Sequence, residues 1–102
     1  MSAYSTIITR NATAASQLLK AVANPNRLMI LSQLRLLGGQ SASQLLTNLS
    51  LSQPALSQHL AIMLDEGLIA KEKKGKVTHY RINAGVVSEL LELLDRHFSQ
   101  SL

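Results

Sequence analysis

The sequence predicts a mainly helical domain with one small β-hairpin, in the order of four helices, two strands and a last helix. Along most of the chain, apolar residues recur at spacings of three and four, as the buried face of a helix requires. Residues 68–82 change to near alternation, with Gly75 at the point where a hairpin must turn. With 102 residues, 46% of them hydrophobic, the chain is long enough for one domain with its own core.

Composition and charge narrow the class of partner. Ten Lys and Arg residues against six Asp and Glu residues give a formal charge of +4 and a pI near 9.9. Clustered cations gain affinity by releasing counterions from a phosphate backbone, so we expect a polyanionic partner. The chain has no apolar run as long as a membrane span and no signal-peptide pattern, so we expect a cytoplasmic protein without a membrane partner. The absence of cysteine excludes disulfides, thiolate metal sites and a cysteine nucleophile.

The first two helices have clear boundaries in the sequence. Residues 1–11 are polar and unpatterned, so we expect a flexible arm there and one folded domain over 12–102. An apolar face predicts the first helix from Ala12 to Ala23. Asn24 can cap the next helix and Pro25 suits its first turn, which predicts a second helix over 25–37. The apolar residues of this helix point in several directions, which predicts that the helix is buried on most sides. They are Leu28, Ile30, Leu31, Leu34 and Leu37.

Two capping signals predict the third and fourth helices. Ser41 and Gln44 have the spacing of a capping box, so the third helix should cover 41–48. Ser52 followed by Pro54 predicts the start of the fourth helix, which Gly67 closes. At about 100° per residue, the fourth helix has an apolar side formed by Leu56, Leu60, Met63 and Leu64, and an opposite side formed by Pro54, Ser57, Gln58 and Ala61.

The hairpin and a last helix complete the predicted fold. Two strands should flank a turn at residues 74–76. Asn83 can cap a last helix that runs to about Phe98. The apolar face of this helix is broad and consists of Val87, Leu90, Leu91, Leu94 and Phe98.

The fourth helix exposes side chains of the kind that read DNA. A helix fits the major groove, where Gln and Ser supply donors and acceptors to the base edges. We therefore predict that bases are read by Gln53, Ser57 and Gln58. For an isolated helix, ordinary solvated polar residues would be the better interpretation. The short helix before it and the basic hairpin after it favour a DNA reader.

Cations of the hairpin are predicted to contact the DNA backbone, which positions a protein without reading sequence. They are Lys71, Lys73, Lys74, Lys76 and Arg81, against Glu72 alone. We add Ser52, at the start of the fourth helix, and His59, which borders its apolar side. The alternative is a solubilising edge, because lysines also protect exposed strands from pairing with other chains.

The sequence offers no catalytic or metal site. Ser57 and His59 project about 160° apart on one helix, so they cannot share a proton as in a catalytic triad. Asp95 and His97 point in widely different directions and make a poor chelating pair. We therefore expect a protein that is not an enzyme and that needs no metal and no cofactor.

Three motifs, in this order of elements, resemble the ArsR/SmtB family of bacterial winged-helix regulators. They read Asn-Pro-Asn-Arg-Leu-Met-Ile-Leu at 24–31, Leu-Ser-Gln-Pro-Ala-Leu-Ser-Gln-His-Leu at 51–60 and Asp-Glu-Gly-Leu-Ile at 65–69. The resemblance implies a homodimeric winged helix-turn-helix regulator, either a repressor or an antagonist of a silencing protein. Its two recognition helices would enter successive major grooves of a near-palindromic operator in double-stranded DNA. The implied dimer interface joins the first and last helices, through Ala15, Leu18, Leu19, Val22, Val87, Leu90, Leu91, Leu94 and Phe98.

The chain departs from the metal sensors of this family. Those members carry Cys-x-Cys on the third helix, or Asp and His ligands at the start of the last helix. Here the two stretches read Ser-Gln-Leu-Leu-Thr and Ala-Gly-Val-Val-Ser-Glu-Leu, so neither can hold zinc. Leu64 stands where relatives usually have Arg, so one polar or phosphate contact of the family is not expected here.

Within the family, the chain resembles the subgroup of HlyU, BigR and SqrR, whose members respond to oxidants or reactive sulfur species through two cysteines. Ser32 and Ser99 occupy the positions of those cysteines. Serine matches the shape of cysteine but cannot form a disulfide or polysulfide bridge. Either the chain is a natural thiol-free regulator with another signal, or it is an engineered variant. A rival from another class is a winged-helix module that binds protein instead of DNA.

Overall fold

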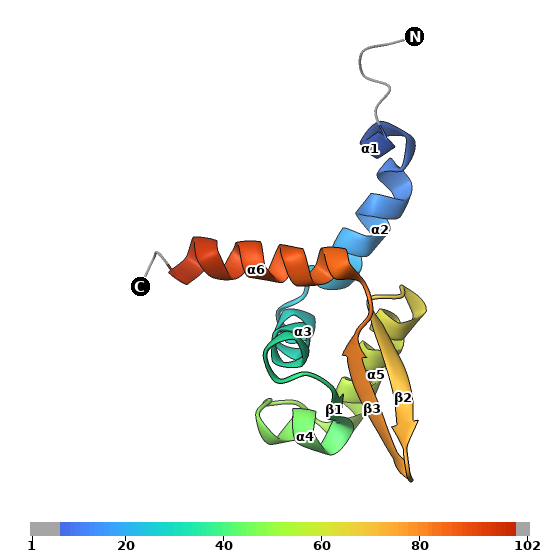
Figure 1. Ribbon diagram of the computed structural model, residues 1–102, viewed down its shortest axis with the longest axis vertical. Helices are drawn as coiled ribbons and strands as arrows, with labels where there is room; N and C mark the ends of the chain where they lie inside the picture. Colours follow the sequence, from blue (N-terminus) through green and yellow to red (C-terminus); the bar gives the residue numbers. More distant parts are fainter. Residues whose placement is uncertain (1–6, 100–102) are drawn as a thin grey trace.

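The structure is a computed structural model that describes residues 7–99. Helices α1 and α2 lead into the main body, which ends with helix α6 (Figure 1). The elements are α1 (Ile7–Arg10), α2 (Ala12–Val22), α3 (Pro25–Leu37), β1 (Gln40–Ser41), α4 (Ala42–Thr47), α5 (Gln53–Asp65), β2 (Ile69–Lys74), β3 (Val77–Ile82) and α6 (Gly85–Ser99). The predicted order of four helices, a hairpin and a last helix is confirmed as α2 to α6, with α1 and β1 in addition.

Helix α1 and strand β1 are the two short elements that the sequence did not predict. Helix α1 lies within residues 1–11, where the sequence predicts a flexible arm. Residues 1–6 of that arm lie outside the described residues, so the domain boundary stays a prediction. Strand β1 follows directly from Gly38 and Gly39, and it is too short to show any alternation in the sequence. Sequence reasoning therefore missed it.

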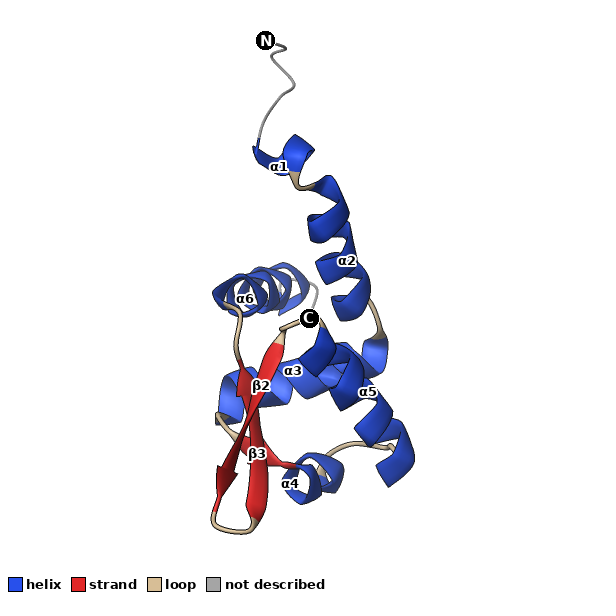
Figure 2. Ribbon diagram, turned by 90° about the vertical axis from the view of Figure 1, so that its right-hand side faces the viewer, coloured by secondary structure: helices blue, strands red, loops and turns tan. Residues whose placement is uncertain are grey.

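Helix α2 extends away from the main body, which consists of α3, α4, α5, the sheet and α6. Figures 1 and 2 show α2 rising away from this body with α1 at its far end, while α6 crosses above α3. The carboxyl end of α2 contacts α3 and α5, and α6 contacts α3 and β3. Within residues 7–99, no helix has both the length and the apolar composition needed to cross a membrane.

One core joins all the large elements. Its buried members are Ala21, Val22, Ile30, Leu31, Leu34, Leu45, Leu49, Leu56, Leu60, Met63, Leu68, Ile69, Val87 and Leu91. The predicted apolar side of the fourth helix is confirmed, since three of its members are buried. The expectation that the second helix is buried on most sides is wrong for the single chain, because Met29, Leu36 and Leu37 on α3 are at least half exposed.

Three predicted helix caps are confirmed. Asn24 Oδ1 accepts hydrogen bonds from the backbone N–H groups of residues 26 and 27, at 2.9 and 3.1 Å. Ser41 and Gln44 form a reciprocal capping box, and Ser52 Oγ accepts from the N–H of Ala55 at 3.2 Å. Each of these bonds satisfies a backbone donor that the first turn of a helix leaves without a partner.

The prediction that Asn83 caps the last helix is wrong. Helix α6 begins two residues after it, at Gly85. The Asn83 amide nitrogen lies 3.5 Å from the carbonyl oxygen of Gly67, and its backbone N–H donates to the carbonyl of Leu68 at 3.0 Å. Both bonds hold the end of β3 against the segment that follows α5. The local signal of a capping residue was overridden by this tertiary contact.

The sheet has the strand order β1-β3-β2, and both pairings are antiparallel. In the β2–β3 hairpin, Lys74 pairs with Val77, so the turn consists of Gly75 and Lys76 at the predicted place. Gly75 has a φ of 65°, a conformation that a residue with a Cβ adopts only with strain. Positive φ at the first of two turn residues suits the twist of a tight hairpin.

Candidate nucleic-acid interface

Helices α4 and α5 form the compact helical pair at the centre of the site. Residues 48–52 join them, and this short connection holds the helices at an angle instead of side by side (Figure 2). Leu45 of α4 and Leu56 of α5 are both fully buried in the core. The first turn of α5 is fixed by the Ser52 cap and by Pro54. The amino-terminal half of α5 is thus anchored on the body by its cap and by the buried Leu56.

The outward side of α5 contains the predicted base-reading residues. Gln53, Ser57 and Gln58 are all exposed, whereas Leu56 and Leu60 on the inward side are buried. Gln and Ser can each donate and accept hydrogen bonds, as major-groove recognition requires. This side of the helix can therefore meet base edges without disturbing the core.

Ser52 and His59 hold different positions relative to this surface. Ser52 is exposed, and although its oxygen accepts the cap bond, its O–H proton can still be donated to a phosphate. His59 is half-buried, with Nδ1 3.4 Å from Nη1 of Arg27. Sequence reasoning missed Arg27 as a member of the site, because its partner lies 32 residues further along the chain.

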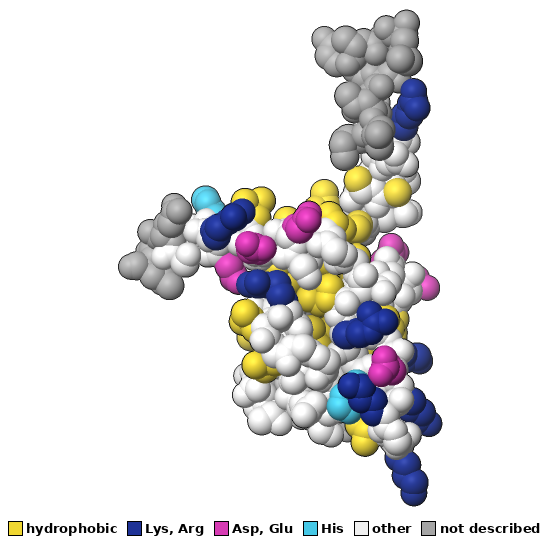
Figure 3. All heavy atoms as spheres, in the orientation of Figure 1, with side chains coloured by type: hydrophobic (Ala, Val, Ile, Leu, Met, Phe, Trp, Pro, Cys, Tyr) yellow, Lys and Arg dark blue, Asp and Glu magenta, His cyan; other side chains and the backbone are white. Residues whose placement is uncertain are grey.

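The predicted backbone-contacting cations do not share one side of the hairpin. Side chains that face each other across antiparallel strands lie on the same side of the sheet, and successive residues alternate between sides. The register therefore puts Lys71 and Lys73 on one side and Lys74 and Arg81 on the other, with Lys76 in the turn. Figure 3 shows Lys and Arg side chains along the edge and the tip of the hairpin. The five cations are therefore divided between the two sides of the hairpin and its turn.

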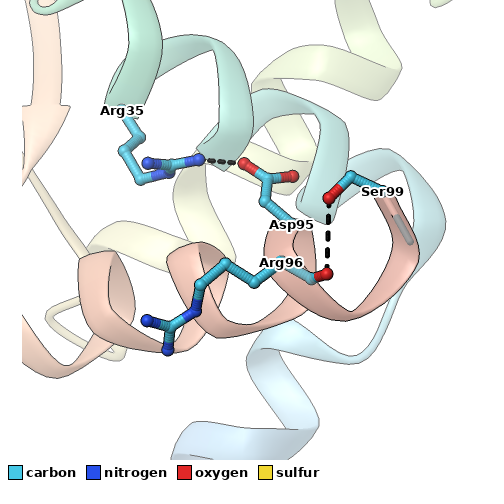
Figure 4. A network of polar contacts seen from close by, with 4 residues as sticks. All are labelled: Arg35, Asp95, Arg96 and Ser99. Atoms are coloured by element: carbon cyan, nitrogen blue, oxygen red, sulfur yellow. Dashed lines mark hydrogen bonds and ion pairs between the residues drawn. The ribbon is translucent and has the colours of Figure 1, made fainter.

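Ser32 and Ser99, the serines at the predicted sensing positions, lie close in sequence to a contact between α3 and α6. Arg35 of α3 and Asp95 of α6 form an ion pair, and Ser99 Oγ donates to the carbonyl of Arg96 at 3.3 Å (Figure 4). Ser32 precedes Arg35 by three residues and Ser99 follows Asp95 by four, so each serine neighbours a member of the pair on its own helix. Ser32 also lines a groove of about 230 Å³ beside this contact, together with Leu28, Met29, Leu91, Leu94, Asp95 and Phe98.

The residues predicted for a dimer interface divide into two groups. Val22, Val87 and Leu91 are at most 5% exposed in the single chain, so they have almost no surface left for a partner. Leu19 and Phe98 are more than half exposed, and Ala15, Leu18, Leu90 and Leu94 are half-buried. Val86 and Leu93, which were not among the predicted residues, are 52% and 54% exposed on the outer side of α6. Periodicity alone could not separate the two apolar sides of this helix.

Metal-binding side chains do not cluster in the described part of the chain. Among residues 7–99, no group of three or more His, Cys, Asp or Glu side chains could hold a metal ion. Asp95, which the sequence predicts to make a poor chelating pair with His97, forms an ion pair with Arg35.

Comparison with known proteins gives the family of the chain. Residues 24–71 match the family described as "Bacterial regulatory protein, arsR family". The transcriptional activator HlyU of Vibrio cholerae is 40% identical over 92 residues, which cover 90% of this chain and 84% of HlyU. The chain belongs to the ArsR family. The arsenical resistance operon repressor of Escherichia coli is 37% identical over 79 residues, covering 78% of this chain and 68% of the repressor.

A solved structure extends the similarity to the whole fold. Reduced HlyU from Vibrio cholerae has a TM-score of 0.81 and 40% identity, over 89% of this chain and 95% of that one. The predicted winged helix-turn-helix is thereby confirmed, with α4 and α5 as the helix-turn-helix and the β2–β3 hairpin as the wing. The chain is a DNA-binding transcriptional regulator of the ArsR family, and the relatives named above are regulators, not enzymes.

Proposed function

We propose that this ArsR-family chain reads a near-palindromic operator with α5 and holds the DNA backbone with the wing. The observation that supports this most directly is the division of α5 into two sides. Its apolar side is buried, and its other side exposes Gln53, Ser57 and Gln58 beside a hairpin rich in lysine. As an operator-binding protein it would act in the cytoplasm, where the DNA of a bacterial cell lies. Its effect is that of a repressor or an antagonist of a silencing protein.

The proposed operator requires two copies of the chain. Leu19 on α2 and Val86 and Leu93 on α6 expose apolar surface that a second copy would cover. Figure 3 shows hydrophobic atoms at the surface where α2 and α6 meet. In a twofold dimer the same surface meets itself, and a palindromic operator mirrors that symmetry. The homodimer would place one α5 in each half-site.

Salt titration of duplex binding tests the proposal. An operator can be selected from a pool of random duplexes, and its affinity is then measured as the salt concentration rises. We expect a loss of about a thousandfold or more between about 50 and about 200 mM salt, because two wings would release many counterions. If no duplex binds even at low salt, the chain is instead a winged-helix module whose α5 packs against another protein.

We further propose that the scaffold is of the type that senses oxidants or reactive sulfur species, with serines in the two sensing positions. Ser32 and Ser99 lie on the two helices joined by the Arg35–Asp95 ion pair, so a covalent bridge there would act on the packing of α3 against α6. The hydroxyl groups of serine cannot form such a bridge. The chain as it stands should therefore keep one DNA-binding state under oxidants.

Restoring both thiols tests the sensing proposal. The double variant Ser32→Cys, Ser99→Cys should lose operator binding on treatment with peroxide or persulfide and regain it with a reductant. The matched control is the double variant Ser16→Cys, Ser43→Cys, whose two positions are exposed on α2 and α4. Its operator binding should be insensitive to peroxide and persulfide. Operator affinity is measured by fluorescence anisotropy before and after oxidation. A double variant whose binding ignores both reagents would show that the scaffold is not of this type.

A further inference from the structure

Arg27 joins three elements of the protein through one guanidinium group. Its Nε donates to the carbonyl of Ala21 at 2.6 Å, and its Nη2 lies 3.5 Å from the carbonyl of Lys20. Its Nη1 lies 3.4 Å from Nδ1 of His59. The arginine itself belongs to the first turn of α3, so the last turn of α2, the start of α3 and the recognition helix α5 meet at this side chain.

The local sequence explains why Arg27 reaches the end of α2. The last carbonyl groups of a helix lack partners within the helix, and a cation at that end interacts favourably with the helix dipole. Asn24 lies at the turn between the two helices, and its Oδ1 accepts a hydrogen bond from the backbone N–H of Arg27 at 3.1 Å. This turn directs the arginine side chain back toward the residues that precede it.

The packing of α2 against α5 is incomplete beside this contact. An open cleft of about 230 Å³ lies between them, lined by Gln17, Lys20, Ala21, Arg27, Ile62 and Glu66. Ala21 and Val22 pack the carboxyl end of α2 into the core, and the cleft leaves the side next to Arg27 without such packing. The planar guanidinium group, with its donors in a rigid fork, supplies a fixed distance where side-chain packing leaves space.

The contact with His59 also constrains the histidine ring. Arginine has only donors, so Nδ1 must accept, and the proton of the neutral ring is then on Nε2. His59 directly follows Gln58, one of the proposed base-reading residues. The orientation and the tautomer of this ring are thus tied to the end of α2.

We infer that Arg27 is a positioning residue that couples α2 to the recognition helix and holds His59 in its Nε2–H form. The inference rests on the proposed function, in which α2 contributes to the dimer and α5 reads the operator. In such a dimer, the angle between α2 and α5 sets the separation of the two recognition helices. Arg27 then determines how strictly the protein selects the spacing between half-sites.

A structural role confined to capping α2 would give a different result from this coupling. Loss of a cap lowers the free energy of unfolding but leaves the preference for half-site spacing unchanged. It also has no effect on the His59 ring. The tautomer and the spacing preference are therefore the two measurements that separate coupling from simple stabilisation.

The first experiment is nitrogen-15 NMR of the histidine rings in the unmodified protein, with His59→Gln used to assign the signals. We expect the His59 shifts of a ring protonated on Nε2. The Arg27→Met variant should shift the ring toward a mixture of tautomers, while Arg96→Met, which removes a charge from an exposed position on α6, should not. A wild-type ring protonated on Nδ1 would overturn the inference, even if the Arg27→Met variant failed to fold.

The second experiment compares operators whose half-sites are moved apart or together by one base pair. Arg27→Met should bind the selected operator about tenfold more weakly than Arg96→Met, and it should discriminate less between the altered spacings. Arg27→Lys keeps the charge without the fork, so it should also lose spacing discrimination. If Arg27→Met keeps the full spacing preference, Arg27 is not the coupling residue. If the wild type binds no duplex, the proposed function itself fails, whereas the NMR result still reports on the contact.

Discussion

Replacing Leu93 by glutamate is expected to leave a folded monomer that binds the operator at least about a hundredfold more weakly than the wild type does. Leu93 is 54% exposed on the outer side of α6, so the substitution spares the core of the chain. In the proposed dimer, however, the new carboxylate would lie in a buried apolar contact, where an unpaired charge is strongly unfavourable. A monomer then contacts one half-site and loses the gain from simultaneous binding of two. Sedimentation equilibrium gives the mass, and fluorescence anisotropy gives the operator affinity.

The matched control for this variant is Leu36→Glu. Leu36 is 66% exposed on α3, outside the proposed interface, and receives the same change of size and charge. It should remain dimeric and bind the operator nearly as the wild type does. A Leu93→Glu protein that keeps the dimer mass would contradict the proposed interface. Loss of the dimer in the Leu36 variant instead would move the interface to α3.

Local features of the fold were predictable from the sequence because their causes are local. The caps at Asn24, Ser41 and Ser52 use side chains that bond the backbone two or three residues further along. The turn at Gly75 needs a residue that adopts positive φ. The two sides of α5 follow from helical spacing alone. In each case the residues that interact are neighbours in the chain.

Features that depend on distant contacts were not predictable in this way. Asn83 has the chemistry of a helix cap, yet its side chain contacts the carbonyl of Gly67. The contact of Arg27 with His59 requires the relative placement of three helices. On α6, Val87 and Val86 look equivalent in the sequence, but the first is fully buried and the second is 52% exposed. Such differences arise only when the elements are packed together.

The wing illustrates a signal that was present in the sequence. Alternation along a strand already separates Lys71 and Lys73 from Lys74, because neighbouring side chains point to opposite sides. The sequence prediction treated the five cations as one group. The strand register shows that they are divided between the two sides of the hairpin and its turn. The useful property of the wing is therefore how its charges are divided between the two sides and the turn, and the exposed turn residue Lys76 is the natural one to test.

Single substitutions on α5 and on the wing should separate sequence reading from backbone binding. Gln58→Ala should reduce discrimination against mismatched operators by about 1–3 kcal/mol, because a side chain that bonds a base edge is lost. Lys76→Ala should weaken all duplexes similarly and lower the salt slope by about one. Affinities are measured for the selected operator, single mismatches and a random duplex over a range of salt concentrations. Arg96→Ala, which removes the same charge from α6, is the control.

The two substitutions are informative together because they act on different quantities. Loss of a phosphate contact changes the affinity for every duplex by the same factor, so the ratio between operator and random DNA is preserved. Loss of a base contact changes that ratio while leaving the salt slope intact, since no counterion is involved. Equal losses of specificity from Gln58→Ala and Lys76→Ala would mean that the wing also reads sequence. In that case α5 could not be regarded as the sole reading element of the interface.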